Sequence, residues 1–274
     1  MSDPDTQAGT RGERLRADLL LLLVALVWGS AFVAQRLGME KVGPFTFNAT
    51  RFAVGALTLI PVTGWQRLRA IPRIELRRGA LLGLLLFTAA SLQQIGLIWT
   101  TAGKAGFITG LYVVIVPLLL ALIWRDWAGW SSWLAAGLAA TGLLLLSLRV
   151  DAVTRVDAVT RAGLRMSPGD GWVLGSAVIW ALHVIAIGRI APGRDALRLA
   201  MVQFTVCSLL SLAAALLLEP ATWPRLLLAV PAVAYAGLFS IGLGYTGQVV
   251  AQRHTKPTHA AIILSLESVF AAVF

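Results

Sequence analysis

Polar side chains that can bind a ligand stand out in this sequence because they interrupt long apolar runs. Glu267 is the only carboxylate inside any such run, and His183 and Arg51 are the other ionisable side chains there. Amides and aromatic rings with a polar atom complete the candidates: Gln93, Gln94, Gln203, Gln248, Trp28, Trp180, Tyr112 and Tyr245. Polar groups within a membrane are costly and usually face a bundle interior or a wet cavity. The chemistry they indicate is noncovalent binding of a polar solute.

Helical spacing brings several of these side chains onto shared faces. Trp180 and His183 are three residues apart, and Tyr245, Gln248 and Gln252 form a polar stripe at i, i+3 and i+7. We predict one substrate-binding cavity lined by Trp28, Gln94, Trp180, His183, Tyr245, Gln248 and Glu267. Structural alternatives stay open: packing or interfacial anchoring for the tryptophans, bonds between helices for the amides, and snorkelling for Arg51. His183 and Glu267 are equally open to a purely structural pairing.

Motifs for soluble-enzyme chemistry are absent from the sequence. It has no G-x-x-x-x-G-K-S/T loop, no H-E-x-x-H motif, and a single cysteine, Cys207. We therefore predict no cofactor, no metal site and no ATP-driven pump, with energy coming from a gradient of substrate or of protons. The rival class is an intramembrane enzyme acting on lipid. It would need two catalytic polar residues at one membrane depth, and only Glu267 and His183 are candidates.

Composition places the chain in a lipid bilayer. Of its 274 residues, 58% are hydrophobic and 13% are charged, against about 25% charged in soluble domains. The net charge of +10 is carried in short clusters between apolar runs, which is typical of membrane proteins. These values argue against a soluble enzyme and against a nucleic-acid partner.

Eight apolar runs are long enough to predict membrane helices, and a ninth starts near Pro257 but is too short, as given, to cross a bilayer. They are Leu19–Gln35, Phe45–Gly64, Gly79–Gly103, Ala105–Trp124, Trp127–Leu148, Gly171–Gly188, Leu199–Leu218, Leu226–Gln252, and a run from Pro257 to Phe274. The first run has the features of a signal peptide, but the spans that follow favour a membrane helix. Because the runs are continuous and do not alternate, we predict an all-α integral membrane protein.

Loop charges predict the orientation. With a cytoplasmic N-terminal tail at residues 1–17, the inner segments carry 14 Lys and Arg residues and the outer loops carry eight, which favours that orientation. Half of the outer charges lie between Arg149 and Arg165, where VDAVTR occurs twice at 150–161. We interpret this tandem as a surface insertion in a periplasmic loop at 149–170, with a binding loop as the alternative.

An internal repeat relates the two sides of that loop. A shift of 152 residues places Trp28 on Trp180, and a shift of 154 places Gln94 on Gln248 and Ala105–Ile108 on His259–Ile262. Since the first copy, 18–148, has five spans, the second, 171–274, must have the opposite orientation. Inverted repeats are common in secondary transporters, with the substrate site at their interface. The sequence therefore predicts a ten-helix bundle of two inverted five-helix repeats.

Completing the second copy requires the rest of helix nine and a tenth helix. The first copy uses about 28 residues for the same elements, from Leu120 to Leu148. We expect the natural protein to continue for roughly 25–35 residues past Phe274.

Small residues and one proline predict close packing and a bend. Glycines four residues apart let membrane helices approach closely, and three such pairs occur: Gly79 and Gly83, Gly106 and Gly110, and Gly171 and Gly175. Substitution of Gly171 is expected to reduce folding yield. Pro117 is expected to kink the fourth helix.

Several segments resemble the EamA family of the drug/metabolite transporter superfamily. They are ALVWGSAFV at 25–33, TRFAVGAL at 50–57, AGFITGLYVVIVPLL at 105–119 and IILSLESVFAAVF at 262–274. In the last segment Ser268 stands where the family often has proline, so we expect that helix to lack the family's kink. The resemblance implies ten helices in two inverted repeats and alternating access.

Within the family, the chain is most similar to bacterial exporters of aromatic amino acids. The similarity implies export of amino acids, especially aromatic or hydrophobic ones, through a bacterial inner membrane, with protons as the candidate coupling ion. Another small metabolite or drug is the alternative. A nucleotide sugar or sugar phosphate ranks lower because Arg51 is the only cation inside a span.

Overall fold

The computed structural model describes residues 11–64, 71–154, 167–220 and 223–273. Every regular element within these ranges is a helix, and none of them is a strand. Seven helical stretches there are long and apolar enough to cross a membrane. The expected all-α membrane class is confirmed at this level, while the ten-helix arrangement of inverted repeats stays a prediction.

The helices follow the predicted spans closely in position. In chain order they are α1 (Arg11–Met39), α2 (Pro44–Thr63), α4 (Arg73–Leu97), α5 (Ala102–Gly110), α6 (Tyr112–Trp124), α7 (Trp130–Thr154), α8 (Pro168–Ile190), α9 (Ala196–Leu218), α10 (Trp223–Tyr235), the π-helix η2 (Ala236–Tyr245), α11 (Thr246–Ala251), α12 (Pro257–Leu264) and α13 (Glu267–Ala271). Helix α7 continues to Thr154, into the segment that the sequence predicts to be a loop. Residues 155–166, which hold the second VDAVTR copy, lie outside the described residues.

Three predicted spans are not single α-helices. The fourth divides into α5 and α6 at Leu111, and the ninth divides into α12 and α13 at Ser265 and Leu266. The eighth passes through η2, a ten-residue π-helix. Pro117 lies inside α6, so the break in the fourth span precedes the proline that was expected to bend it.

The ninth span bears on a second expectation, that its helix lacks a kink. Although Ser268 replaces the family's proline, the helix is interrupted immediately before it, and the Ser268 amide bonds the Ser265 carbonyl at 3.2 Å. The Ser268 hydroxyl donates to the Gly106 carbonyl on α5 at 2.6 Å. A side-chain bond to a neighbouring helix therefore accompanies the interruption at Ser265 and Leu266, in a helix that the sequence predicted to lack a kink.

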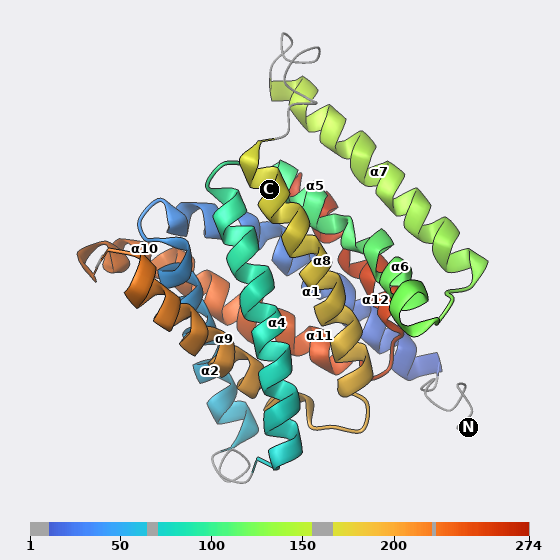
Figure 1. Cartoon of the computed structure of the whole chain (residues 1–274), viewed down its shortest axis with the longest axis horizontal. Coiled ribbons are helices and arrows are strands. Elements are labelled where there is room, and N and C mark those ends of the chain that lie inside the picture. Colours follow the sequence, from blue (N-terminus) through green and yellow to red (C-terminus); the bar gives the residue numbers. More distant parts are fainter. Residues whose placement is uncertain (1–10, 65–70, 155–166, 221–222, 274) are drawn as a thin grey trace.

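Helices of the two halves interleave. Helix α2 packs against α9, α4 packs against both α8 and α9, and α1 packs against η2, α11, α12 and α13. Figure 1 shows α4 and α8 side by side in the middle of the view, with α7 running along one edge of the bundle. This interleaving places residues from both halves around a shared interior.

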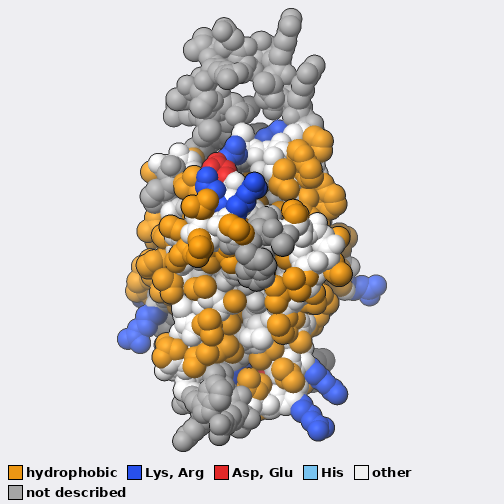
Figure 2. Space-filling model, turned by 90° about the vertical axis from the view of Figure 1, so that its left-hand side faces the viewer, with side chains coloured by type: hydrophobic (Ala, Val, Ile, Leu, Met, Phe, Trp, Pro, Cys, Tyr) orange, Lys and Arg blue, Asp and Glu red, His pale blue; other side chains and the backbone are white. Residues whose placement is uncertain are grey.

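The outer surface suits lipid. Many large apolar side chains are exposed, among them Leu217 at 83% and Leu227 at 76%. Figure 2 shows hydrophobic side chains over much of the viewed face, with a cluster of charged side chains near its upper end. Exposed apolar patches of this extent are rare on soluble monomers, so these faces are assigned to the bilayer.

Glycines permit the closest contacts between halves. A Cβ added to Gly79 would lie 2.6 Å from the Val202 Cβ, and one added to Gly83 would lie 2.7 Å from the Val206 Cβ. This confirms the predicted close packing at Gly79 and Gly83. By contrast, an added Cβ at Gly171 meets nothing within 4 Å, and one at Gly175 meets only the Leu92 side chain at 3.9 Å.

The tight contact of α8 with α4 involves Gly169, two residues before the predicted glycine. A Cβ there would overlap the Gly96 carbonyl oxygen on α4. We expect Gly169→Ala to lower folding yield and thermal stability, since forced overpacking costs about 1–3 kcal/mol. The matched variant Gly171→Ala is expected to match the wild type, which reverses the sequence-based expectation. Melting of both variants in detergent checks the pair, and equal melting temperatures would contradict this assignment.

A buried carboxylate joins α8 to α5 and to the loop that follows α4. Asp170, near the start of α8, forms an ion pair with Lys104 and accepts a hydrogen bond from the Thr100 hydroxyl at 2.8 Å. It also accepts from the Ser167 amide at 2.7 Å. Asp170 therefore ties the start of the second half to α5 and to the loop that precedes it.

Candidate functional site

One cavity lies where helices of the two halves meet. Its volume is about 30 Å³, so this conformation has room for little more than a water molecule, and a larger solute requires the surrounding helices to move apart. The side chains around it come from α1, α2, α4, α5, α6, α8, η2, α11, α12 and α13, and they are Trp28, Phe32, Gln35, Arg51, Gln93, Thr109, Tyr112, Trp180, Val184, Ser240, Tyr245, Gln248, Leu264 and Glu267. Both halves of the chain therefore contribute to a single interior site.

Broken helices flank this cavity in corresponding positions. Helix α5 ends at Gly110 and α12 ends at Leu264, which are separated by the 154-residue offset found in the sequence repeat. Tyr112 and Glu267, which begin the following helices α6 and α13, both line the cavity. Interrupted membrane helices in matching positions of two halves are the best structural indication of a transporter binding site.

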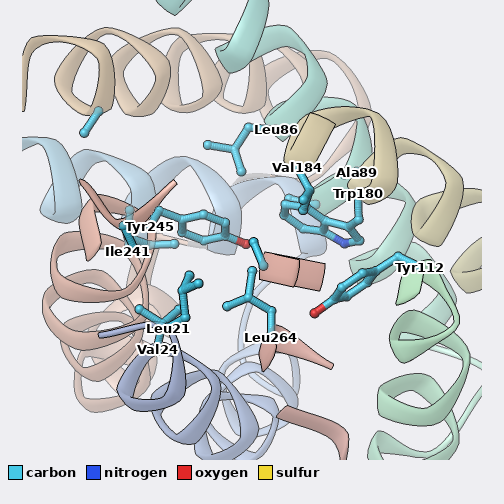
Figure 3. Packing of buried hydrophobic residues seen from close by; sticks show 14 of the residues in the cluster. Leu21, Val24, Leu86, Ala89, Tyr112, Trp180, Val184, Ile241, Tyr245 and Leu264 are labelled. Carbon is cyan, nitrogen blue, oxygen red and sulfur yellow. The ribbon is translucent and has the colours of Figure 1, made fainter. Parts of the chain in front are cut away.

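Aromatic rings form one wall. The ring centre of Tyr245 lies 4.5 Å from that of Trp28. It lies 5.7 Å from the ring centre of Trp180, on which it stacks with an interplanar angle of 19°. The Trp28 indole donates to the Ser240 carbonyl in η2 at 3.0 Å, which fixes its ring against that helix. Figure 3 shows Tyr245 beside Trp180, with the hydroxyls of Tyr245 and Tyr112 pointing inward from opposite sides. Flat rings at these separations suit stacking with another ring.

Polar atoms around the cavity lack partners. Among the described residues, four lining side chains have a buried polar atom without a hydrogen bond: Gln35 Oε1, Arg51 Nε, Trp180 Nε1 and Gln248 Oε1. The side-chain amide nitrogen of Gln93 donates a hydrogen bond to the Thr109 hydroxyl oxygen at 3.0 Å. Most buried polar groups in proteins are paired. Unpaired polar atoms around one cavity can therefore bind a polar ligand or water.

Five of the seven predicted residues surround the cavity: Trp28, Trp180, Tyr245, Gln248 and Glu267. The other two, Gln94 and His183, do not line it. His183 lies behind the aromatic wall, 5.7 Å from the Trp180 ring, and its Nε2 bonds the Gln203 amide oxygen at 3.1 Å. Gln94 is fully buried in α4 with both amide atoms unpaired.

Sequence reasoning left several lining residues out of the predicted set. The sequence did mark Arg51, Tyr112 and Gln93 as candidates, because each is a polar group in an apolar run. Gln35, Thr109 and Ser240 carried little, since small or neutral polar residues are common near span ends and in helix contacts. Their place around the cavity depends on how the helices pack.

Gln252 separates this cavity from a second, larger pocket. Its amide donates to the Val184 carbonyl at 2.9 Å, and Val184 lines the first cavity. Gln252 itself lines the second pocket, which has a volume of about 490 Å³ and includes Arg14, Arg253 and Lys256. The predicted stripe of Tyr245, Gln248 and Gln252 thus runs from one pocket to the other.

Known proteins resemble most of this chain. An uncharacterized transporter of Archaeoglobus fulgidus is 31% identical over 274 residues, covering 98% of this chain and 80% of the relative. The uncharacterized transporter YvbV of Bacillus subtilis is 27% identical over 205 residues, covering 71% of this chain and 61% of the relative. A solved crystal structure shares the fold, with a TM-score of 0.71, 20% identity, and coverage of 93% of this chain and 85% of the other.

A family comparison agrees with these likenesses. The model of the EamA-like transporter family matches residues 15–148 and again residues 167–274. Together the two matches cover most of the sequence, and the seven helices of membrane-spanning length fit such a protein. The chain therefore belongs to the EamA-like transporter family and is a multi-pass membrane transporter of small substrates.

Proposed function

We propose that the protein exports amino acids, especially aromatic or large apolar ones, across the bacterial cytoplasmic membrane by alternating access. The observation that carries this proposal is the cavity between the halves, which combines an aromatic wall with unpaired polar atoms. An apolar solute would leave those polar atoms unpaired, and a small polar solute would leave the rings without a partner. An aromatic amino acid matches both parts.

The aromatic wall would bind the side chain. Trp28, Trp180 and Tyr245 present ring surfaces around one space. Burial of an aromatic ring is worth about 25 cal/mol for each Å² removed from water, with about 0.5–1.5 kcal/mol more for each well-placed ring pair. Alanine or glycine would gain little of either contribution, so affinity should rise with side-chain size.

The polar groups would bind the backbone of the amino acid. The ammonium and carboxylate groups of a substrate cannot enter an apolar site unpaired. Gln248 offers a free amide oxygen and Glu267 a carboxylate, both at the cavity surface. Glu267 would take the ammonium group or a competing proton, which makes it the candidate for proton coupling.

The proposed architecture is two inverted repeats of five helices, 18–148 and 171–274, joined by the segment 149–170. Two features support it. The family model matches the chain twice, on either side of that segment, and the helix breaks are separated by the repeat offset. Alternating access would then follow from movement of one repeat against the other around the shared cavity.

The proposed orientation has the N-terminus in the cytoplasm and the 149–170 segment in the periplasm. We expect a cysteine at Thr160, in a Cys207→Ser background, to react with an impermeant thiol reagent in whole cells. The charge balance of the inner and outer segments is the physical reason. A cysteine replacing Arg77, near the cytoplasmic start of α4, is the matched control and should react after membrane rupture. The opposite pattern would reverse the orientation.

Transport in proteoliposomes tests the function directly. We expect the purified protein to take up labelled phenylalanine, tryptophan and leucine faster than alanine or glutamate, and excess unlabelled phenylalanine to compete. Empty liposomes provide the background. Uptake confined to sugar phosphates, or conversion of a lipid without uptake of any solute, would overturn the proposal.

A further inference from the structure

Arg51 is a buried cation without an acidic partner. It lies within α2, is 2% exposed, and lines the cavity. Its guanidinium carbon is 5.3 Å from the Phe47 ring centre and 5.1 Å from that of Phe52. Within the described ranges, no carboxylate lies within 4 Å of it and its Nε has no hydrogen bond.

Ring contacts alone do not balance this charge. A cation over an aromatic ring gains about 0.5–2 kcal/mol, whereas removing an ion from water costs several kcal/mol. A guanidinium group presents its donors in a planar fork that matches a carboxylate in a bidentate geometry. The missing partner of Arg51 is therefore best supplied by a carboxylate that enters the cavity.

Glu267 poses the complementary problem in the same cavity. It is 5% exposed and interacts with the Tyr112 hydroxyl, and no basic side chain in the described part of the chain lies within 4 Å of its carboxylate. Tyr245 is near enough to interact electrostatically with both Arg51 and Glu267. The cavity thus holds one acidic and one basic side chain that are not paired with each other, close to the same aromatic ring.

We infer that Arg51 binds the carboxylate of the substrate while Glu267 binds its ammonium group, so that the site selects zwitterionic α-amino acids. The side chain of the substrate then lies against Trp28, Trp180 and Tyr245. This assignment rests on the proposed function and makes it more specific, because it adds Arg51 as a specificity-determining residue. It predicts that removing either charged group from the substrate weakens binding.

Three ligands of nearly equal ring size test the assignment. Phenylalanine carries both charged groups, phenethylamine lacks the carboxylate, and 3-phenylpropionate lacks the ammonium group. Equilibrium binding to the purified wild-type protein should favour phenylalanine at least tenfold over either analogue. A hydrogen bond to a charged group is worth about 1.5–3 kcal/mol, or on the order of tenfold to a hundredfold in affinity.

Variants assign each charged group to its residue. Arg51→Gln should lower the affinity for phenylalanine to that for phenethylamine. It should leave the affinity for phenethylamine within about twofold of wild type. Glu267→Gln should lower the affinity for phenylalanine to that for 3-phenylpropionate. It should leave the affinity for 3-phenylpropionate within about twofold of wild type. Arg189→Gln is the matched control, since Arg189 is exposed and contacts the Trp124 ring outside the cavity. It should leave all three affinities unchanged.

The outcomes separate this inference from the proposed function. Equal affinities of the wild-type protein for phenylalanine and phenethylamine would overturn the inference and leave amino-acid binding intact. This comparison does not depend on the folding of any variant. Equal weakening of both ligands by a monodisperse Arg51→Gln protein would also overturn it, because Arg51 would then be structural. Absence of wild-type binding to all three ligands would instead overturn the proposed function, and the inference with it.

Discussion

Glu267→Gln and Gln248→Ala are each expected to lower amino-acid transport tenfold or more while leaving protein yield near the wild-type level. Both side chains line the cavity, and each would lose a hydrogen bond to a charged group of the substrate, worth about 1.5–3 kcal/mol. Initial uptake rates in proteoliposomes, at equal protein amount, give the measurement.

Glu75→Gln is the matched control for Glu267→Gln. Glu75 is also a largely buried carboxylate on a helix, but it pairs with Arg198 at 3.4 Å and lies outside the cavity. Its substitution should leave the uptake rate close to that of the wild type. Wild-type transport by the Glu267→Gln and Gln248→Ala proteins would remove the support for this cavity as the substrate site.

Tyr245→Leu is expected to produce the largest combined loss of stability and affinity, whereas Tyr245→Phe should resemble the wild type. Tyr245 contacts the rings of Trp28, Trp180, Phe52 and Phe204. Each such pair is worth about 0.5–1.5 kcal/mol beyond its buried area, and leucine removes them all. Phenylalanine retains the ring and loses only the hydroxyl.

Thermal melting in detergent and phenylalanine binding measure both effects. The Tyr245→Phe protein separates ring packing from hydroxyl chemistry. If it loses as much affinity as Tyr245→Leu, the hydroxyl and not the ring surface binds the substrate, and the aromatic wall would need reassignment.

The course of the membrane helices could be predicted well from apolar runs. The second span was expected at Phe45–Gly64, and α2 covers Pro44–Thr63. The breaks could not be predicted in the same way. Leu111 and Leu266 are ordinary helix-forming residues, and the nearby proline lies six positions past the first break. Such interruptions depend on tertiary contacts such as the bond from Ser268 to Gly106, which hydropathy does not encode.

The candidate site was predictable where a polar group was unusual for its surroundings. Trp180, Tyr245 and Glu267 all line the cavity. The choice of Gln94 followed from its alignment with Gln248 in the repeat. Helical geometry turns adjacent residues about 100° apart, and the cavity receives Gln93. Helical periodicity identifies a polar face of a helix. The packing of neighbouring helices decides which residues of that face line the cavity.

Glycine patterns show the same difference. Gly79 and Gly171 both belong to pairs with four-residue spacing. Only the first fills a tight contact in the structure, where an added Cβ would meet Val202. The spacing identifies a helix face that can pack closely, and it does not identify the neighbour. At α8 the close neighbour of α4 is Gly169, which has no partner four residues away in the sequence.

Substrate protection of a cavity cysteine tests the central claim most directly. Ser240 lines the cavity, and serine to cysteine is nearly isosteric. In a Cys207→Ser background, we expect phenylalanine to slow the reaction of Ser240→Cys with a small methanethiosulfonate reagent several-fold, whereas glutamate should not. Ser132→Cys, in the second pocket, should react at the same rate with or without phenylalanine. Equal labelling of Ser240→Cys in the presence and absence of phenylalanine would contradict the assignment of this cavity as the substrate site.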